Sequence, residues 1–267
     1  MRALLLRQSY ERQVLVVYIG AIAMTVIDGT MLNVALPAIA DQFGVEANEA
    51  EWVAIGYLLA VAAVIPAAGW LGDRFGTRRI FLLALSGFVG TSLICGLTRS
   101  VEQLVAARLL QGLGGGLILP VGSAMLFRAF PLNRRAVAAS AVLSVAVLAP
   151  ATGPLLGGIL VDQASRRWIF YIYVPIGALV LVLARAVLVE EQHDAPGRLD
   201  LPGLVLTSGG VATLLAAVSI GPDRGWGSGL AVALFAIGVV VLVAAVVTEL
   251  RVAEPALALR LFRDRLF

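Results

Sequence analysis

Long runs of apolar residues dominate this chain of 267 residues, and short polar segments separate them. The runs are apolar on all sides, without the alternation of a half-buried strand. Roughly 20 helical residues are enough to cross about 30 Å of hydrocarbon. The pattern therefore predicts eight membrane-spanning helices, near residues 14–37, 51–71, 80–97, 101–127, 136–161, 168–189, 201–220 and 230–248.

The polar segments divide these spans into groups. Residues 1–189 hold six spans with short connections, so the expected fold class is an all-α membrane protein built on a six-helix bundle. Residues 190–200 are rich in charge, proline and glycine and are expected to form a cytoplasmic linker. Residues 201–250 add an extra pair of spans, and residues 251–267 form a cytoplasmic tail where a further span is expected to begin. We therefore expect an N-terminal fragment of a longer protein.

The composition indicates a lipid environment, because 60% of the residues are hydrophobic, 14% are charged and the mean hydropathy is +0.95. A soluble domain of this size would expose too much apolar surface. Arginine supplies all 20 basic residues, and 15 of them fall in segments that the positive-inside rule assigns to the cytoplasm. We expect a multi-pass plasma-membrane protein with both termini in the cytoplasm. The net charge of +3 follows from this topology and indicates no nucleic-acid partner.

Few side chains are available for catalysis or ligand coordination. Cys95, the only cysteine, lies within the third predicted span, and His193, the only histidine, lies in the linker. Neither a cluster of metal ligands nor a phosphate loop with its lysine can be assembled from this sequence. We therefore expect no metal, no cofactor and no enzymatic activity.

Two ionisable residues lie inside predicted spans, where a charge is costly and marks a functional site by default. Asp28 lies in the first span, and Arg108 lies in the fourth with Gln111 on the same helix face. If these spans are neighbours, the two charges can meet, and protonation of Asp28 would release Arg108. Met24 and Met31 share the face of Asp28 and are expected to line a site for a greasy substrate. The alternatives are that Asp28 only fixes helix packing and that Arg108 extends to the lipid headgroups.

Glycine and proline mark three further segments. Residues 69–79 are expected to form a tight glycine turn that serves as a conformational latch between helices, or only to satisfy the positive-inside rule; the latch residues are Gly69, Asp73, Arg74, Gly76, Arg78 and Arg79. Gly112 and Gly116 have the spacing of a close helix contact. The fifth span concentrates helix-perturbing residues, which predicts a bend or a sliding seam; these residues are Pro150, Gly153, Pro154, Gly157 and Gly158.

These segments together resemble the motifs of a known family, the major facilitator superfamily. Residues 69–79 resemble its GxLaDrxGrkxxl loop, and residues 108–114 resemble the RxxQGxg pattern of its fourth helix. Residues 149–158 are similar to its GPxxGG antiporter motif, and residues 28–37 to the DxTxxNVALP signature of its 14-helix drug:proton antiporter branch. The resemblance covers essentially the whole chain. One departure is Tyr173, which stands where the family carries asparagine.

The resemblance implies proton-coupled efflux of amphipathic, drug-like compounds. It places Asp28, Arg108 and Gln111 in proton or substrate coupling and Asp73 in the latch. It also implies that a second six-helix half is needed in cis or in trans, because alternating access requires two halves around one site. Two alternatives stay open: the same fold exports one specific metabolite or natural product, or the chain is a truncated membrane protein that does not transport.

Overall fold

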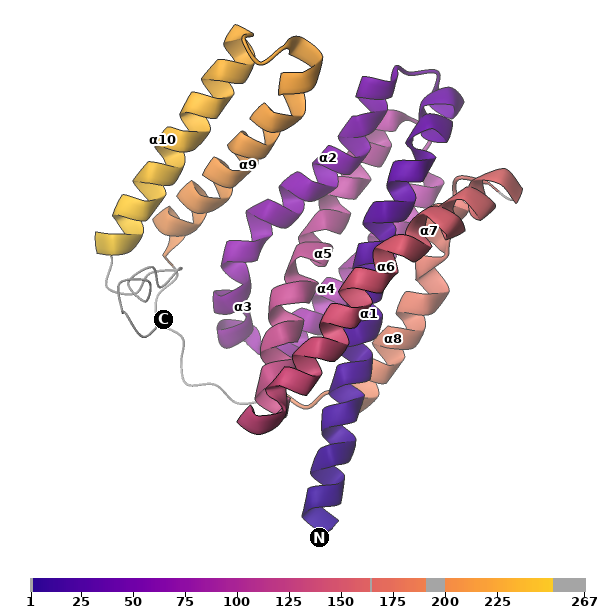
Figure 1. Cartoon of the computed structure of the whole chain (residues 1–267), viewed down its shortest axis with the longest axis vertical. Coiled ribbons are helices and arrows are strands. Elements are labelled where there is room, and N and C mark those ends of the chain that lie inside the picture. Colours follow the sequence, from indigo (N-terminus) through magenta and orange to yellow (C-terminus); the bar gives the residue numbers. More distant parts are fainter. Residues whose placement is uncertain (1, 164, 191–199, 252–267) are drawn as a thin grey trace.

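Helices make up the protein in the computed structural model, which describes residues 2–163, 165–190 and 200–251. Six long helices form a bundle (Figure 1): α1 (Arg2–Phe43), α2 (Ala47–Val64), α4 (Thr77–Leu97), α5 (Val101–Ala129), α6 (Arg135–Gln163) and α8 (Tyr173–Val187). Beside the bundle, α9 (Leu201–Arg224) and α10 (Gly229–Arg251) form a helical hairpin. The short helices are η1 (Ile65–Ala67), α3 (Ala68–Phe75), η2 (Leu132–Arg134) and α7 (Trp168–Tyr171).

Eight helical segments in this described part are long and apolar enough to cross a membrane, judged by length and composition. Helices suit this environment because they satisfy their backbone hydrogen bonds internally, where lipid offers no partners. The protein is therefore an all-α, multi-pass membrane protein, and the predicted fold class is confirmed.

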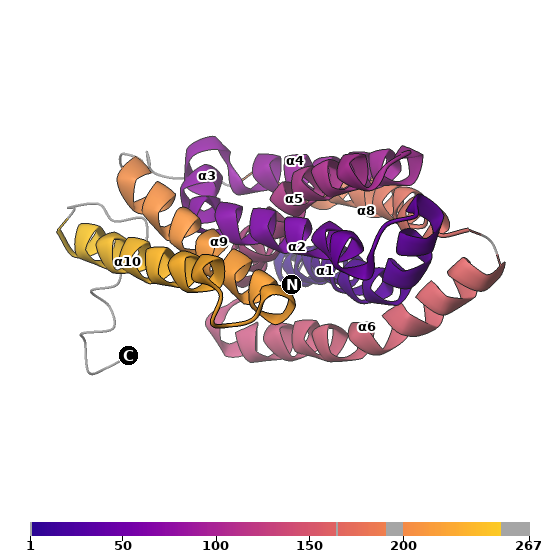
Figure 2. The ribbon, with the colours of Figure 1, turned by 90° about the horizontal axis from the view of Figure 1, so that it is seen from above.

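The helices of the bundle pack around α1 and α5. α5 lies against α2 and α4, and α1 lies against α6, α5 and α8. Seen from above, α6 lies on the opposite side of α1 from α4 and α5 (Figure 2). The hairpin joins the bundle through α9, which packs along α2, and Ser208 Oγ donates a hydrogen bond of 2.6 Å to the Ala63 carbonyl.

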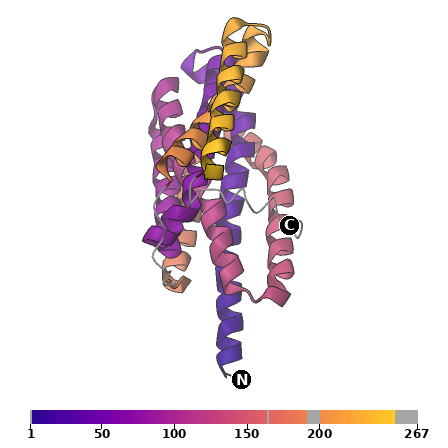
Figure 3. The same ribbon diagram turned by 90° about the vertical axis from the view of Figure 1, so that its left-hand side faces the viewer.

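The bundle has two ends, which we call the N-terminal end and the far end. The N-terminal end holds the start of α1, and the far end holds the α1–α2, α4–α5 and α9–α10 connections (Figures 1 and 3). At the far end, Ser100 Oγ caps α5 by accepting a hydrogen bond from the Gln103 amide. Asp200 caps α9 in the same way at the other end of the hairpin, through the Gly203 amide.

Several boundaries differ from the prediction. The second span, expected at 51–71, is interrupted by η1, because Pro66 has no amide hydrogen to continue the α-helical pattern, and the chain then continues as α3 to Phe75. The sixth span, expected at 168–189, is divided at Ile172 between α7 and α8. The first helix runs through Pro37 to Phe43, beyond the expected end of the span.

The tight turn expected over residues 69–79 is wrong in its extent. Gly69 lies inside α3, and Arg78 and Arg79 lie in the first turn of α4. The reversal is made at Gly76 alone, whose φ of 94° lies in the region that favours glycine. Most of the predicted linker, including His193, and the tail with Arg260, Arg263 and Arg265 lie outside the described residues.

Candidate functional site

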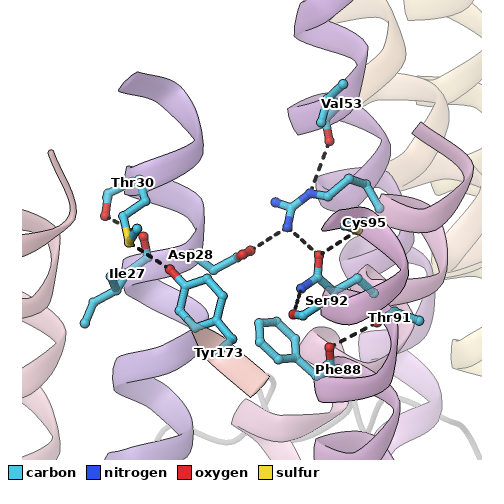
Figure 4. A network of polar contacts seen from close by, with 12 residues as sticks. Ile27, Asp28, Thr30, Val53, Phe88, Thr91, Ser92, Cys95 and Tyr173 are labelled. Carbon is cyan, nitrogen blue, oxygen red and sulfur yellow. Dashed lines mark hydrogen bonds and ion pairs between the residues drawn. The ribbon is translucent and has the colours of Figure 1, made fainter. Parts of the chain in front are cut away.

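Asp28 of α1, labelled in Figure 4, forms a buried ion pair with Arg108 of α5. Arg108 Nη1 donates a hydrogen bond to Asp28 Oδ2 over 2.7 Å, and the two side chains are 1% and 0% exposed. Arg108 therefore does not extend to the lipid headgroups. A buried charge needs such a partner, because removing one member leaves the other uncompensated in a medium of low polarity.

Neutral groups also hold the Arg108 guanidinium. Nη1 donates to Oε1 of Gln111, one turn further along α5, over 2.5 Å, and Nε donates to the Val53 carbonyl of α2 over 3.4 Å. The guanidinium carbon lies 4.3 Å from the centre of the Tyr57 ring, which is a cation–π contact. The cation thus keeps partners on α2 and α5 that do not depend on the charge of Asp28.

Gln111 extends the polar network to α4. Its Nε2 donates a hydrogen bond to Ser92 Oγ over 2.5 Å, and the Cys95 thiol donates weakly to its Oε1 over 3.7 Å. Ser92 and Cys95 are both buried. Four helices, α1, α2, α4 and α5, therefore contribute to one connected network in the middle of the bundle (Figure 4).

The ion pair retains unused hydrogen-bonding capacity. Within the described part of the chain, Asp28 Oδ1 and Arg108 Nη2 are buried and have no hydrogen-bond partner. Buried polar atoms are almost always satisfied, so an exception is a reason to look for function at that position. Chemically, the arrangement can accept a proton on the carboxylate or a polar group of a ligand beside the guanidinium.

Glycines on α5 allow α2 to supply Val53 and Tyr57 to the site. A Cβ on Gly112 would overlap the backbone of Tyr57, and a Cβ on Gly116 would lie 2.9 Å from the Val61 Cα. The close contact predicted from the glycine spacing is therefore present, and the partner helix is α2.

The glycines of α6 contact α1 beside Asp28. A Cβ on Gly153 would overlap the Thr30 side chain, and a Cβ on Gly157 would lie 3.2 Å from the Met31 carbonyl. Gly158 has open space around it. α6 passes through Pro150 and Pro154 as one continuous helix, and Figure 2 shows it bowed around α1. The sliding of this seam stays a prediction.

The methionines near Asp28 are buried within this chain and do not line an open site. Met24 is 3% exposed and Met31 is 0% exposed. Met24 packs toward Gly177 of α8, and the sulfur of Met31 accepts a hydrogen bond from the Tyr173 hydroxyl over 3.1 Å. The expected methionine lining is therefore wrong for this conformation, because α8 covers that face. Tyr173, the departure from the family pattern, is part of this covering.

The predicted latch residues lie at the N-terminal end of the bundle. Asp73 of α3 forms an ion pair of 3.3 Å with Arg128 of α5, and both side chains are partly exposed. Arg74 is exposed, and Gly69 has open space where a Cβ would stand. The acidic residue of the segment therefore connects α3 to α5.

The other latch residues meet Glu190, which follows α8. Its Oε1 and Oε2 accept hydrogen bonds from the backbone amides of Arg78 and Arg79, each over 3.2 Å. Arg79 Nε also lies 3.8 Å from Glu190 Oε2, and Arg78 Nη2 donates to the Arg185 carbonyl over 3.1 Å. A Cβ on Gly76 would overlap the Glu190 carboxylate, so glycine leaves room for this contact. Glu190 thus caps α4 and ties it to the end of α8.

Sequence reasoning missed several of these partners. Tyr57 and Ser92 lie in predicted spans that are mostly apolar. The only signal in the sequence that could have identified them is that each carries a polar atom within a membrane-spanning segment. The sequence pattern places Glu190 in the linker, away from the helices that it joins. Glu11, whose side chain is 3% exposed, pairs over 2.7 Å with Arg134, a contact between residues 123 positions apart that no local pattern indicates.

A cation–π contact between Arg166 and Phe43 lies at the far end of the bundle. Arg166, in the connection between α6 and α7, is buried and lies 3.9 Å from the centre of the Phe43 ring at the end of α1. Burial, and secondly the charge of Arg167, lower the pKa of Arg166 to about 10. Arg166 therefore stays charged at neutral pH.

No group of three or more His, Cys, Asp or Glu side chains in the described ranges could hold a metal ion. The site described above is instead built from one ion pair and its neutral hydrogen-bond partners.

Comparisons with known proteins agree with this architecture. The family model of the Major Facilitator Superfamily matches residues 18–264. The chain is 38% identical to the multidrug resistance protein B homolog of Mycobacterium tuberculosis (strain CDC 1551 / Oshkosh), over 92% of this chain and 46% of that protein. It is 35% identical to the probable multidrug resistance protein EmrY of Escherichia coli (strain K12), over 91% of this chain and 48% of that protein.

The fold is also found among solved structures. A crystal structure of the peptide transporter POT in complex with sulfate matches with a TM-score of 0.66 and 17% identity, over 90% of this chain and 53% of that chain. Such low identity indicates a common fold only. The chain spans about half the length of the curated relatives it matches. Since the family model matches nearly the whole chain, this protein belongs to the Major Facilitator Superfamily.

Proposed function

We propose that this chain is the N-terminal part of a proton-coupled antiporter that exports amphipathic, drug-like compounds across the plasma membrane. In this proposal, residues 1–189 form one transporter half, residues 190–200 link it on the cytoplasmic side to the extra helix pair at 201–250, and residues 251–267 lead toward a second half. Two relatives named for multidrug resistance support the substrate class.

The observation that carries the proposal is the buried ion pair between Asp28 and Arg108. When a proton binds Asp28, the carboxyl group loses its charge and its strong attraction for Arg108. Arg108 then keeps Gln111, the Val53 carbonyl and the Tyr57 ring, all on α2 and α5. Proton binding thus weakens the link between α1 and α5, whereas in the deprotonated state a cationic or polar substrate can compete with Arg108 for the carboxylate.

The membrane potential supplies energy for this exchange. One elementary charge moving down a potential of 100 mV releases about 2.3 kcal/mol, so one or two protons support a modest concentration gradient of substrate. In our proposal the contacts of Asp73 with Arg128, and of Glu190 with the start of α4, hold the N-terminal end of this half together while it rocks as one body.

The test is uptake of ethidium into everted vesicles that contain the full-length transporter, because uptake into such vesicles corresponds to export from the cell. Asp28→Asn should abolish accumulation driven by a proton gradient but retain exchange of substrate across the membrane without a gradient. Asp41→Asn is the matched control, because Asp41 is an exposed residue of the same helix. Full proton-driven accumulation by Asp28→Asn would refute the coupling role.

A competition assay in the same vesicles tests the substrate class. Inhibition of ethidium transport by dyes that share only hydrophobicity supports multidrug efflux. Saturation by a single compound class, with no effect of the other dyes, would instead identify a specific exporter.

A further inference from the structure

A cavity of about 260 Å³ lies at the far end of the molecule, between α2 and the α9–α10 hairpin. It is separate from the Asp28–Arg108 site. Polar side chains from two helices line it: Asn48 and Glu49 from the first turn of α2, and Ser219 and Arg224 from the end of α9. Trp52 forms one wall.

The cavity presents one charge of each sign on separate helices. Glu49 and Arg224 are both exposed, and the ion pairs of the described residues do not join them. A ligand that carries an anion and a cation a few bonds apart can therefore contact both at once. A purely anionic ligand would be repelled by Glu49, and a purely cationic ligand would be repelled by Arg224.

The position and the remaining walls indicate an amphiphile. Trp52 in the wall and Trp226 in the adjacent α9–α10 connection are both partly or largely exposed at this end, as tryptophans at lipid headgroups are. Ile55, Ile220 and Leu230 supply the apolar part of the lining. The cavity thus combines charged and apolar lining residues at the end of the membrane-spanning helices, which suits an amphiphile.

We propose that this cavity binds the headgroup of phosphatidylethanolamine. Its phosphate accepts hydrogen bonds from the Arg224 guanidinium, whose planar fork suits phosphate oxygens. Its primary ammonium donates to the Glu49 carboxylate and to the side-chain carbonyl of Asn48. A choline headgroup cannot donate these hydrogen bonds, and a glycerol headgroup has no cation for Glu49. The bound lipid fills the seam between the six-helix bundle and the extra helix pair.

Native mass spectrometry of the purified chain, titrated with phosphatidylethanolamine, phosphatidylcholine and phosphatidylglycerol of equal acyl chains, tests this proposal without any transport assay. We expect phosphatidylethanolamine to bind about tenfold more tightly than phosphatidylglycerol, the factor that one additional charge-assisted hydrogen bond supplies. Equal affinity of the unaltered chain for the three lipids would overturn the proposal.

Two variants separate the two contacts. Arg224→Gln should weaken both phosphatidylethanolamine and phosphatidylglycerol, whereas Glu49→Gln should weaken phosphatidylethanolamine only and so remove the selectivity. Arg99→Gln and Glu102→Gln are matched controls, because these exposed residues lie at the same end of the bundle outside the cavity. Variants that bind like their controls would refute the assignment. Complete displacement of the lipid by soluble phosphoethanolamine would show a site for a soluble zwitterion instead.

Discussion

Gln111 joins Arg108 to Ser92 of α4, and the sequence does not indicate this contact between helices. Its side-chain oxygen accepts from Arg108, and its nitrogen donates to Ser92 of α4. An amide is suited to this position because it offers an acceptor and a donor on opposite sides without adding a charge to the buried pair. Gln111 therefore fixes the direction in which Arg108 approaches Asp28.

Replacing Gln111 by leucine tests this bridge. Gln111→Leu leaves Arg108 and Ser92 each without one buried partner, so the free energy of unfolding should fall by roughly 1 kcal/mol. Thermal unfolding in detergent, followed by circular dichroism, measures the change. Gln13→Leu, at an exposed position of α1, should have little effect. Equal loss in both variants would show that the bridge contributes nothing specific.

At the scale of helices, the contact of α5 with α2 shapes the site. The glycine face of α5 admits the Tyr57 backbone, and this places the Tyr57 ring and the Val53 carbonyl around Arg108. The small residues thus serve the charged site as well as the packing of the bundle.

Gly112→Ala should separate α2 from α5, because the added methyl group overlaps the Tyr57 carbonyl. We expect a loss of about 1–3 kcal/mol in the free energy of unfolding, as for overpacked cores. Gly87→Ala in α4 is the control, since a Cβ there has open space. Unfolding temperatures of the two variants in the same detergent provide the comparison, and an unchanged Gly112→Ala protein would show that the helices move apart at no cost.

The cap formed by Glu190 gives a second prediction for the helices. Glu190→Gln keeps the shape of the side chain but removes its charge, which weakens the hydrogen bonds to the α4 amides by about 1 kcal/mol. Hydrogen exchange at Arg78 and Arg79 should therefore accelerate. Glu51→Gln, at an exposed position of α2, should leave hydrogen exchange at Arg78 and Arg79 unchanged. Unaltered exchange in Glu190→Gln would mean that the first turn of α4 is held by other contacts.

The helices could be predicted from the sequence because lipid requires long apolar segments, and the positions of Asp28 and Arg108 on two such segments followed directly. The interruption at η1 was missed because Pro66 lies within an apolar run that otherwise reads as one span. The extent of the 69–79 turn was wrong because its glycines permit a helix as well as a turn, and packing decides between them. The partners of Arg78 and Arg79 lie more than 100 positions away, so only the folded structure identifies them.

At the scale of the whole molecule, the described helices form a six-helix bundle with an additional hairpin, and in our proposal the bundle is one half of a transporter. Alternating access in our proposal needs a second half that faces this one. The family match and the lengths of the relatives agree with such an arrangement. In this proposal, the chain by itself offers only one side of a transport path.

Expression of the two halves as separate chains tests this. This chain alone should give no ethidium efflux, whereas its co-expression with the remaining half of the full-length transporter should restore a measurable part of the activity. Restoration should disappear when this chain carries Asp28→Asn. Efflux by this chain alone, at the level of the co-expressed pair, would contradict the need for a second half.

Cys95 lies buried beside Gln111, within the network that holds Arg108. A thiol reacts with maleimides as the thiolate and only where water and reagent can reach it. Because the chain has no other cysteine, labelling of this one position reports directly on hydration of the network. This chain therefore carries its own chemical probe of opening: the labelling rate of Cys95 should rise whenever the helices around the ion pair separate, and no engineered cysteine is needed in these 267 residues to observe it.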